Sequence, residues 1–485
     1  MRRLLLPLFL VLVAVGCGVG AVYADAGGET AEASVEIESP ITPVLSARRV
    51  PDHITEDIAD RRLTTALTGL VGAAPQDTCL VVDAGGRPII AHQAATGLIP
   101  ASNEKVLVAA AALDELGPRH RYTTTVKAQT APNGQGVVAG DLWLVGGGDP
   151  VLATRRYAQT SDIQDEAHTS LETLADRVVA AGVTEVRGRV LGDESRYDSE
   201  RYVDAWPSRF IDQNQTGPLS ALSVNDGFSS FPTASDPGAA ESASSNPPAL
   251  AAQTFADLLA ARGVRITGGA GTGTAPAQAP EIAEVRSARL RDITAQLLTW
   301  SDNQTAELVI KEVGFARNGR GSTASGSDAV EAVLTDAGFD LAGSDAVDGS
   351  GLAGSNRVTC GLLHQVLAEA GPGSPLVRGL AVAGETGTLA ATFNGTPAEG
   401  RLRAKTGSLN EARGLSGVVI VPEGDDITFS LLVNQDFVDA QGDAVRVDVG
   451  LALAAYPQRP NLDQVAPRPL DGPSSAPAED ATPDE

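Results

Sequence analysis

The sequence predicts an α+β fold in which helices flank an antiparallel sheet, and three observations support this prediction. The runs 78–82 and 88–92 are strand-like and flank a turn rich in Asp and Gly, which is typical of a hairpin. Residues 415–421 and 427–433 alternate apolar and polar positions on either side of a short polar turn, which predicts a second antiparallel pair. Helical segments bounded by Pro and Gly lie between these pairs. With 485 residues, the chain is expected to hold more than one domain.

The N-terminus has the pattern of an export signal. Two arginines precede an apolar run over residues 4–15, and small residues follow up to Ala24. Residues 1–24 are therefore predicted to be a secretory signal peptide or an uncleaved membrane anchor, since about 20 apolar residues span a bilayer. Lipidation of Cys17 is a third alternative. In each case we expect the body of the protein to lie outside the cytoplasm.

The next elements follow in order along the chain. Residues 25–60 are acidic and contain scattered prolines, which predicts a linker. A helix is expected to begin near Pro100, because proline suits a first helical turn, and to end at Gly117 and Pro118. Beyond it we expect a helix at 171–181, surrounded by strand-like runs at 122–128, 141–145 and 186–192.

The second half of the chain is richer in helical patterns. Residues 228–248 are dense in Ser, Pro, Ala and Gly and predict a loop. Helices are predicted at 251–262, 290–299 and 304–313. Residues 459–485 are rich in Pro, Ala and Asp, which predicts a disordered tail. Cys79 and Cys360 either form a disulfide, as export permits, or remain two buried thiols.

Charge excludes one class of function and points to a small set of residues. The 36 basic and 61 acidic residues give a net charge of −25, which argues against nucleic-acid binding, since a phosphate backbone is bound by clustered Lys and Arg. The five His are too far apart in sequence to suggest a metal-ligand pair. Arg stays protonated, whereas a buried Lys can lose its proton and act as a base. The lysines are few, namely Lys105, Lys127, Lys311 and Lys405.

The first motif is Ser-x-x-Lys, formed by Ser102 and Lys105. Residues three apart share a helix face, so the hydroxyl and the amine can meet. The first helical turn also places Ser102 at the positive end of the helix dipole, where a developing anion is favoured. A serine hydroxyl needs a base to become a nucleophile, and a buried lysine near another cation can be neutral and serve as that base. The alternative is an ordinary helix start with a surface lysine.

The second motif is Ser301-Asp302-Asn303, at the junction of two predicted helices. Ser, Asp and Asn at such a junction commonly cap a helix. In the functional alternative, the Ser301 hydroxyl relays a proton and the Asn303 amide hydrogen-bonds a peptide substrate.

The third motif is Lys405-Thr406-Gly407, which we expect at the end of a strand. A glycine there can let the backbone of a bound peptide come close. Lys405 and the hydroxyls of Thr406 and Ser408 would then face a substrate carboxylate. The alternative is an exposed strand end with a solvated lysine.

Together, and in this order, the three motifs resemble the trio of penicillin-binding proteins and class A β-lactamases. The sequence resembles in particular the D-alanyl-D-alanine carboxypeptidase/endopeptidase group, the low-molecular-mass class C penicillin-binding proteins of peptidase family S13. The resemblance runs from about residue 60 to 457 and includes segments 142–150, 220–226, 348–352 with Asn356 and Thr359, and 384–389. It implies a penicillin-binding transpeptidase-like (β-lactamase-like) domain, with an antiparallel sheet flanked by helices, that an inserted domain interrupts.

The resemblance also implies a domain organisation. The catalytic domain would comprise residues 61–120 and 285–458, and the inserted part residues 121–284. The sequence departs from the family pattern after Asp226, where the low-complexity stretch 227–248 stands in the place of a further small domain. That second insert is therefore expected to be reduced or missing.

Catalytic roles follow from the resemblance, residue by residue. Ser102 would attack the carbonyl between the two D-alanines of a peptidoglycan stem peptide, with Lys105 as the base for acylation. Ser301 would pass a proton to the departing amine, while Asn303 would hold the peptide amide. Lys405 would sustain the electrostatics around Ser301 and the substrate carboxylate.

Substrate binding and partners are implied in the same way. Thr406, Gly407 and Ser408 would bind substrate, and the backbone N–H groups of Ser102 and Ser408 would form the oxyanion hole. The expected partners are peptidoglycan stem peptides and β-lactam antibiotics that acylate Ser102, with no nucleic acid, no metal and no organic cofactor. The protein would be secreted, associated with the cell wall, or anchored to the outer face of the cytoplasmic membrane.

Other functions remain open from the sequence. A β-lactamase or an esterase on the same fold is disfavoured by the long insert. An inactive cell-wall binding scaffold is disfavoured because it has no need to retain Ser102, Lys105, Ser301, Asn303 and Lys405 together. The motifs do not separate carboxypeptidase from endopeptidase action, and they do not give the oligomeric state.

Overall fold

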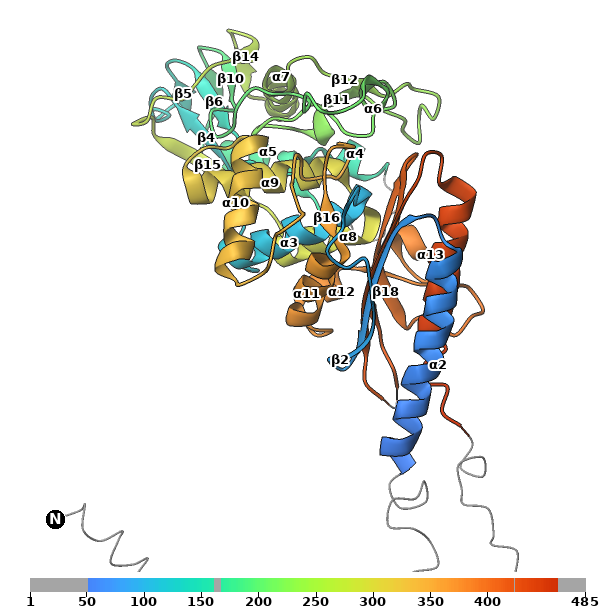
Figure 1. Ribbon diagram of the computed structural model, residues 1–485. Helices are drawn as coiled ribbons and strands as arrows, with labels where there is room; N and C mark the ends of the chain where they lie inside the picture. The colour runs from blue at the N-terminus through green and yellow to red at the C-terminus, as the bar shows by residue number, and fades with distance from the viewer. Residues whose placement is uncertain (1–50, 161–166, 423, 461–485) are drawn as a thin grey trace, which may run out of the picture. The chain divides into compact units, whose positions relative to one another are not determined.

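The computed structural model describes residues 51–160, 167–422 and 424–460 (Figure 1). The predicted signal or anchor at 1–24, with Cys17, lies outside the described residues, as does residue 461 onward of the predicted tail. Within the described ranges, no helix is both long enough and apolar enough to cross a membrane. Residues 55–460 form one compact unit, which is described below.

A six-stranded sheet forms the centre of this unit, and its strand order is β17-β18-β19-β20-β1-β2. All neighbouring strands are antiparallel, which confirms both predicted pairs. β1 lies beside β20, so the N-terminal hairpin extends the C-terminal strands into one sheet. The strands are β1 (Asp77–Ala84), β2 (Arg87–His92), β17 (Ala381–Val382), β18 (Leu402–Leu409), β19 (Ala412–Val419) and β20 (Ile427–Asn434).

Helices cover both faces of this sheet because its strands carry apolar side chains on both sides. In β20, Leu431 and Val433 face one layer and Leu432 faces the other, as the two-residue period of a strand requires. One layer contains α2 (Pro51–Ala73) and α13 (Asp439–Ala454) (Figure 1). The other contains α3 (Glu104–Glu115), α8 (Leu290–Trp300), α9 (Asn303–Asn318), α10 (Thr323–Asp336), α11 (Cys360–Ala370) and α12 (Pro375–Arg378).

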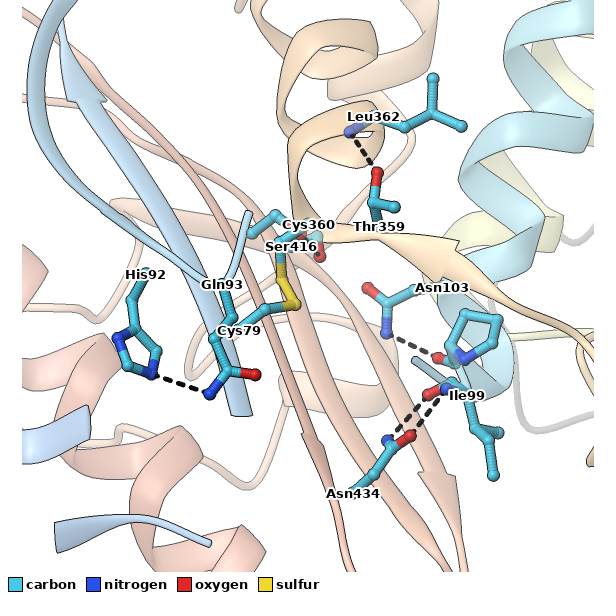
Figure 2. The surroundings of a disulfide bond; sticks show 12 residues. Cys79, His92, Gln93, Ile99, Asn103, Thr359, Cys360, Leu362, Ser416 and Asn434 are labelled. Carbon is cyan, nitrogen blue, oxygen red and sulfur yellow. Dashed lines mark hydrogen bonds between the residues drawn. A yellow bond between two sulfur atoms is a disulfide. The ribbon is translucent and has the colours of Figure 1, made fainter. Parts of the chain in front are cut away.

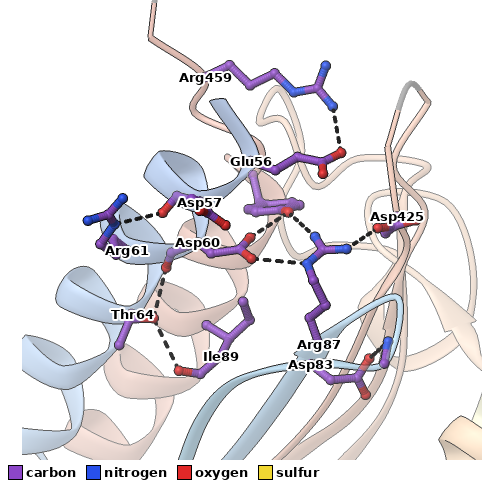
Figure 3. Close-up of polar contacts among 12 residues, drawn as sticks. Glu56, Asp57, Asp60, Arg61, Thr64, Asp83, Arg87, Ile89, Asp425 and Arg459 are labelled. Carbon is purple, nitrogen blue, oxygen red and sulfur yellow. Dashed lines mark hydrogen bonds and ion pairs between the residues drawn. The ribbon is translucent and has the colours of Figure 1, made fainter. Parts of the chain in front are cut away.

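The helix α2 corrects the prediction of a linker over residues 25–60, since it begins at Pro51. Its buried residues Ala59, Leu63, Leu67 and Val71 are four apart, so they form one apolar stripe that packs against the sheet. Polar contacts also hold the helix to the hairpin β1–β2 (Figure 3). Arg87 of the hairpin bonds to Asp60 of α2 at 3.2 Å and pairs with Asp425, and Tyr456 donates to Asp60 at 2.8 Å.

A disulfide ties the central sheet to the helical layer. Cys79 on β1 is bonded to Cys360, the first residue of α11, across 281 residues of sequence (Figure 2). Of the two alternatives that the sequence left open, the structure therefore has the disulfide. Both cysteines are fully buried.

Residues 123–286 form a second, mixed sheet with the order β14-β10-β6-β4-β15. Its strands are β4 (Thr123–Ala128), β6 (Leu142–Val145), β10 (Val190–Asp193), β14 (Ala270–Thr272) and β15 (Glu281–Arg286). A smaller parallel sheet contains β5 (Val137–Val138), β9 (Glu185–Val186) and β13 (Arg265–Ile266). The helices α5 (Leu171–Ala180) and α7 (Pro247–Ala260) pack against these strands.

Three expectations for this region were wrong in detail. The single strand expected at 186–192 is two strands, because the chain leaves the small sheet at Val186 and enters the larger one at Val190. The loop expected at 228–248 contains a short hairpin of β11 (Phe228–Ser230) and β12 (Ser242–Ala243). The helix α7 also starts earlier than predicted, since Asn246 caps it and Pro247 fills its first turn. That residues 121–284 are a separate inserted domain stays a prediction, because residues 55–460 cluster as one unit.

The remaining elements are short. They are β3 (Gly97–Leu98), η1 (Ala101–Asn103), β7 (Leu152–Ala153), α4 (Arg155–Ala158), β8 (Thr169–Ser170), α6 (Ser208–Asp212), η2 (Asn225–Gly227), β16 (Val358–Thr359) and η3 (Gly387–Leu389).

Candidate active site

Ser102 lies in the single turn of 3-10 helix η1, directly before α3. The preceding residue, Ala101, has a φ of 47°, which is rare for a residue with a side chain. Asn103 is fully buried, and its side-chain amide donates to the Pro100 carbonyl at 3.2 Å (Figure 2). This hydrogen bond holds the turn in shape, and α3 follows it from Glu104, so Ser102 precedes the α-helix by one 3-10 turn.

Lys105 is fully buried in the first turn of α3, so the alternative of a surface lysine is wrong. Its Nζ lies 3.0 Å from Ser102 Oγ, 2.8 Å from Asn303 Oδ1 and 2.5 Å from the Ser350 carbonyl oxygen. The structure thus brings together the first and second motifs, which are far apart in sequence.

These contacts orient the lysine amine. The amide oxygen of Asn303 and the carbonyl of Ser350 can only accept hydrogen bonds. Asn303 cannot turn its amide around, since its Nδ2 donates to the Gln215 carbonyl at 2.7 Å. A neutral amine has two hydrogens and one lone pair, so donation to these two acceptors directs the lone pair at the Ser102 hydroxyl. This is the arrangement that a general base needs.

Burial shifts the Lys105 amine toward its neutral form. Burial lowers the pKa of Lys105 from 10.5 to about 8, and the carboxyl groups of Asp348, Glu307, Asp302 and Glu104 oppose that shift. About a tenth of the amine is therefore unprotonated at pH 7, whereas an exposed lysine would be almost wholly charged.

The second motif connects two helices. Ser301 ends α8 with a left-handed φ of 64°, and Asp302 caps α9 by accepting from the Thr305 N–H at 3.0 Å. The capping alternative is therefore correct for Asp302, while Asn303 contacts Lys105. In the described part of the chain, no hydrogen bond joins Ser301 to Lys105 or Lys405.

Lys405 of the third motif is fully buried in β18, which excludes a solvated lysine at a strand end. The strand runs on to Leu409, beyond its predicted end. The Lys405 amine donates to the Thr406 carbonyl at 2.9 Å. Burial lowers its pKa well below the ordinary value, and the neighbouring charges of Lys105 and Arg446 lower it further. The two lysines of the motifs are thus close enough to influence each other's protonation.

Gly407 has a different close neighbour from the one expected. A Cβ at this position would lie 2.6 Å from Asn103 Nδ2 and 2.7 Å from the Pro100 carbonyl oxygen. Because Gly407 has no side chain, the turn that carries Ser102 can pack against it. The sequence had suggested that this space would be used by the backbone of a bound peptide. Thr406 contacts Thr388 of η3 through their hydroxyls at 2.7 Å, and Ser408 lies exposed beside Arg446.

A family model and a curated relative both match most of the chain. The family model described as "D-Ala-D-Ala carboxypeptidase 3 (S13) family" matches residues 54–238 and 229–454. The chain is 31% identical over 493 residues to a D-alanyl-D-alanine carboxypeptidase from Actinomadura sp. (strain R39), covering 86% of this chain and 87% of that one.

Solved structures show the same fold. Penicillin binding protein 4 from Haemophilus influenzae superposes with a TM-score of 0.68 at 21% identity, over 80% of this chain and 98% of that one. The same protein complexed with a β-lactam gives a TM-score of 0.60 at 20% identity over the same shares of the two chains.

The chain belongs to the D-Ala-D-Ala carboxypeptidase 3 (S13) family. Membership makes it a hydrolase of the peptidase class and confirms the resemblance, the α+β β-lactamase-like fold class and the enzyme class that the motifs predicted.

In this S13 carboxypeptidase, two acidic residues without a predicted role support the site. Glu307 accepts from the backbone N–H groups of Gly349 and Ser350, at 3.0 and 2.7 Å. Asp348 accepts from the Gly351 N–H at 2.8 Å and the Ala353 N–H at 2.7 Å. The sequence did single out segment 348–352, but it held no signal that Glu307, distant in the chain, would bind to it.

Proposed function

We propose that this chain is a serine D-alanyl-D-alanine carboxypeptidase/endopeptidase that acts on peptidoglycan stem peptides through an acyl-enzyme on Ser102. The observation that carries the proposal is the position of the Lys105 amine, 3.0 Å from Ser102 Oγ and bonded otherwise only to acceptors. Such an amine can take the hydroxyl proton as the oxygen attacks.

The Lys105–Ser102 contact supports the following proposal for the acylation step. Ser102 Oγ bonds to the carbonyl carbon between the two D-alanines, and its proton moves to Lys105. Backbone N–H groups of Ser102 and Ser408 stabilise the oxyanion. The peptide bond then breaks as a proton reaches the departing amine by way of Ser301. Water hydrolyses the ester at Ser102, which restores the free hydroxyl and releases the shortened peptide.

Substrate contacts are assigned to the remaining motif residues. Asn303 holds the peptide amide, and the Lys405 and Thr406 side chains with Ser408 face the terminal carboxylate. Gly407 lies between them in the same strand and binds substrate with them, and it also admits the turn of Ser102, since a Cβ there would meet Asn103 and Pro100.

β-Lactams present a reactive carbonyl and a carboxylate, so they should acylate Ser102 and inhibit the enzyme. Fluorescent penicillin tests this directly. The wild-type chain should be labelled on the peptide that contains Ser102, and Ser102→Ala should abolish labelling. Ser355→Ala, at an exposed serine, is the matched control and should be labelled like the wild type. An unlabelled wild type, or labelling that persists in Ser102→Ala, would refute the proposal.

Products distinguish the two peptidase activities. Digestion of purified muropeptides should release free D-alanine if the enzyme is a carboxypeptidase, and should split cross-linked dimers if it is an endopeptidase. Mass spectrometry of the products separates the two outcomes.

The site of action is proposed to be outside the cytoplasm. The disulfide Cys79–Cys360 supports this location, because such bonds persist in oxidising compartments. Membrane anchoring through residues 1–24 stays a prediction. Fractionation of cells that express the full chain tests both points, since protein found only in the cytoplasmic fraction would contradict the proposed location.

A further inference from the structure

Glu307 lies on α9, one helical turn after Asn303, and its side chain is fully buried. Its Oε1 accepts from two consecutive backbone N–H groups, those of Gly349 and Ser350. The other oxygen, Oε2, has no hydrogen-bond partner in the described part of the chain. A buried carboxylate would be costly with one oxygen unpaired, so this environment suits a neutral carboxyl group.

The segment that Glu307 binds is the one that orients Lys105. The N–H of Ser350 donates to Glu307, while the carbonyl of the same residue accepts from the Lys105 amine at 2.5 Å. Gly349 leaves no room for a side chain, since a Cβ there would lie 2.8 Å from the Ala306 carbonyl oxygen. Residue 350 is therefore held from one side by α9 and from the other by the catalytic lysine.

We propose that Glu307 is a positioning residue for acylation: by holding the backbone N–H groups of Gly349 and Ser350, it places the Ser350 carbonyl that aims the Lys105 amine at Ser102. The inference rests on the proposed role of Lys105 as the base. Without Glu307, the Ser350 carbonyl can move, and the lysine lone pair is no longer confined to the direction of the serine.

The charge of Glu307 affects the pKa of Lys105, in addition to the positioning by its hydrogen bonds. Burial, and next the charge of Asp348, raise the pKa of Glu307 to about 8. The charged groups that act on Lys105 come from several elements. They are Glu104 on its own helix, Asp302 at the N-cap of α9, Glu307 on α9, Asp348 in the loop between α10 and β16, and Lys405 on β18. A proton on Glu307 removes one negative charge from this group, which helps to keep the pKa of Lys105 low. When Glu307 ionises, it raises the pKa of Lys105 and so delays loss of the lysine proton.

The test is the rate of acylation by fluorescent penicillin, measured as a function of pH for three variants. Glu307→Gln keeps an acceptor oxygen for both N–H groups but cannot become negative. It should acylate within about 3-fold of the wild type near neutral pH, and the rising limb of its pH profile should move to lower pH. Glu307→Ala removes the acceptor and should slow acylation on the order of 10²-fold, the cost of a displaced catalytic group.

Glu312→Gln is the matched control, since Glu312 is buried on the same helix but pairs with Arg196. It should keep the wild-type pH profile even if it unfolds more easily. Each acylation rate is normalised to the fraction of the preparation that penicillin can label. Thermal unfolding shows whether each variant is folded. The dissociation constant for noncovalent binding of penicillin is also measured for Glu307→Ala. If it stays at the wild-type value, the slower acylation arises in the chemical step and not in binding.

Several results would overturn the inference. The first is a folded Glu307→Ala variant with the acylation rate of the wild type. The second is a Glu307→Gln variant whose acylation rate falls as far as that of Glu307→Ala. If Glu307→Ala fails to fold, an unshifted pH profile in Glu307→Gln would decide against it. These outcomes differ from failure of the proposed function, in which the wild type itself would not be labelled at Ser102.

Discussion

Two lysine side chains, Lys105 and Lys405, are buried together in one site, and this makes the charged form of each costly. Lys105 retains nearby carboxyl groups that partly stabilise its charge, whereas the neighbouring charges that act on Lys405 are positive and lower its pKa further. The two residues are therefore not equivalent. Only Lys105 has an amine within hydrogen-bonding distance of the Ser102 hydroxyl.

The pKa of Lys105 predicts the pH dependence of acylation. The amine must be unprotonated to act as a base, so the acylation rate should rise with pH and level off above about 8. Well below that value, the rate should rise about tenfold per pH unit, since the neutral fraction does. Stopped-flow labelling with fluorescent penicillin measures this profile. A rate that stays constant through this range would show that Lys105 is not the base.

Gly407 provides a second prediction for a single residue. An added methyl group would push against Asn103 and Pro100, so Gly407→Ala should displace the turn of Ser102. We expect acylation to slow on the order of 10²-fold. Stability should fall by about 1–3 kcal/mol, as for other overpacked sites. Gly354→Ala is the control, because a Cβ at Gly354 meets nothing within 4 Å. Equal behaviour of the two variants would contradict this account.

Among the elements, β1 and α11 are joined by a covalent bond although they are distant in the chain. The bond Cys79–Cys360 closes a loop of 281 residues and links the central sheet to the helical layer that carries Ser102 and Lys105. A cross-link over so long a loop restricts the unfolded chain and so favours the folded state.

Removal of the disulfide should therefore destabilise the protein. Cys79→Ala with Cys360→Ala should lower the free energy of unfolding by about 2–5 kcal/mol, as measured with denaturant under non-reducing conditions. Each single variant should lose a similar amount to the double variant, because each removes the same bond. Additive losses, or an unchanged unfolding midpoint, would contradict a stabilising role.

The elements that the sequence predicted well are those with a strong local pattern. The hairpin β1–β2 and the pair β19–β20 have clear alternation and turn residues, and α8 and α9 have apolar faces on either side of Ser301. The sequence did not predict the helix α2, because a segment that begins with Pro in an acidic stretch resembles a linker. Its apolar stripe becomes evident only where it packs against the sheet. The boundary at residues 187–189 was missed because membership of two different sheets is set by distant partners.

For the molecule as a whole, segment 196–221 of the predicted insert is hydrogen-bonded to residues of the candidate site. The Gln215 carbonyl fixes the amide of Asn303, and the indole N–H of Trp206 donates to Asp348 at 2.7 Å. Asp198 pairs with Lys311 of α9 at 2.5 Å, so this buried lysine serves structure. Segment 196–221 therefore supports the shape of the candidate site, since its removal would leave Asn303, Asp348 and Lys311 without these partners.

Trp206 tests this support. Trp206→Phe keeps the apolar ring but removes the donor to Asp348, so stability should fall by about 1–3 kcal/mol. Acylation should also slow, because Asp348 holds the loop that contains Ser350. Trp300→Phe is the matched control, since Trp300 is 42% exposed, and it should change stability by less than about 0.5 kcal/mol. Urea unfolding measures the change in stability, and penicillin labelling measures the change in acylation rate. If the unfolding curves of the two variants coincide, the Trp206–Asp348 hydrogen bond does not support the site.

The sequence by itself determined the order and the residues of the three candidate motifs, because Ser102 and Lys105 are close in the chain and two of the few lysines stand in these motifs. It also determined the local elements that carry them. Tertiary structure alone decided which groups complete the site. The Ser350 carbonyl accepts from Lys105, the Gln215 carbonyl accepts from Asn303, and Glu307 accepts from the Ser350 N–H, each across a long stretch of chain. It also decided between the disulfide and two free thiols. The physical reason is that burial and hydrogen bonding between distant segments depend on packing, and packing sets whether a lysine amine is a solvated cation or a base.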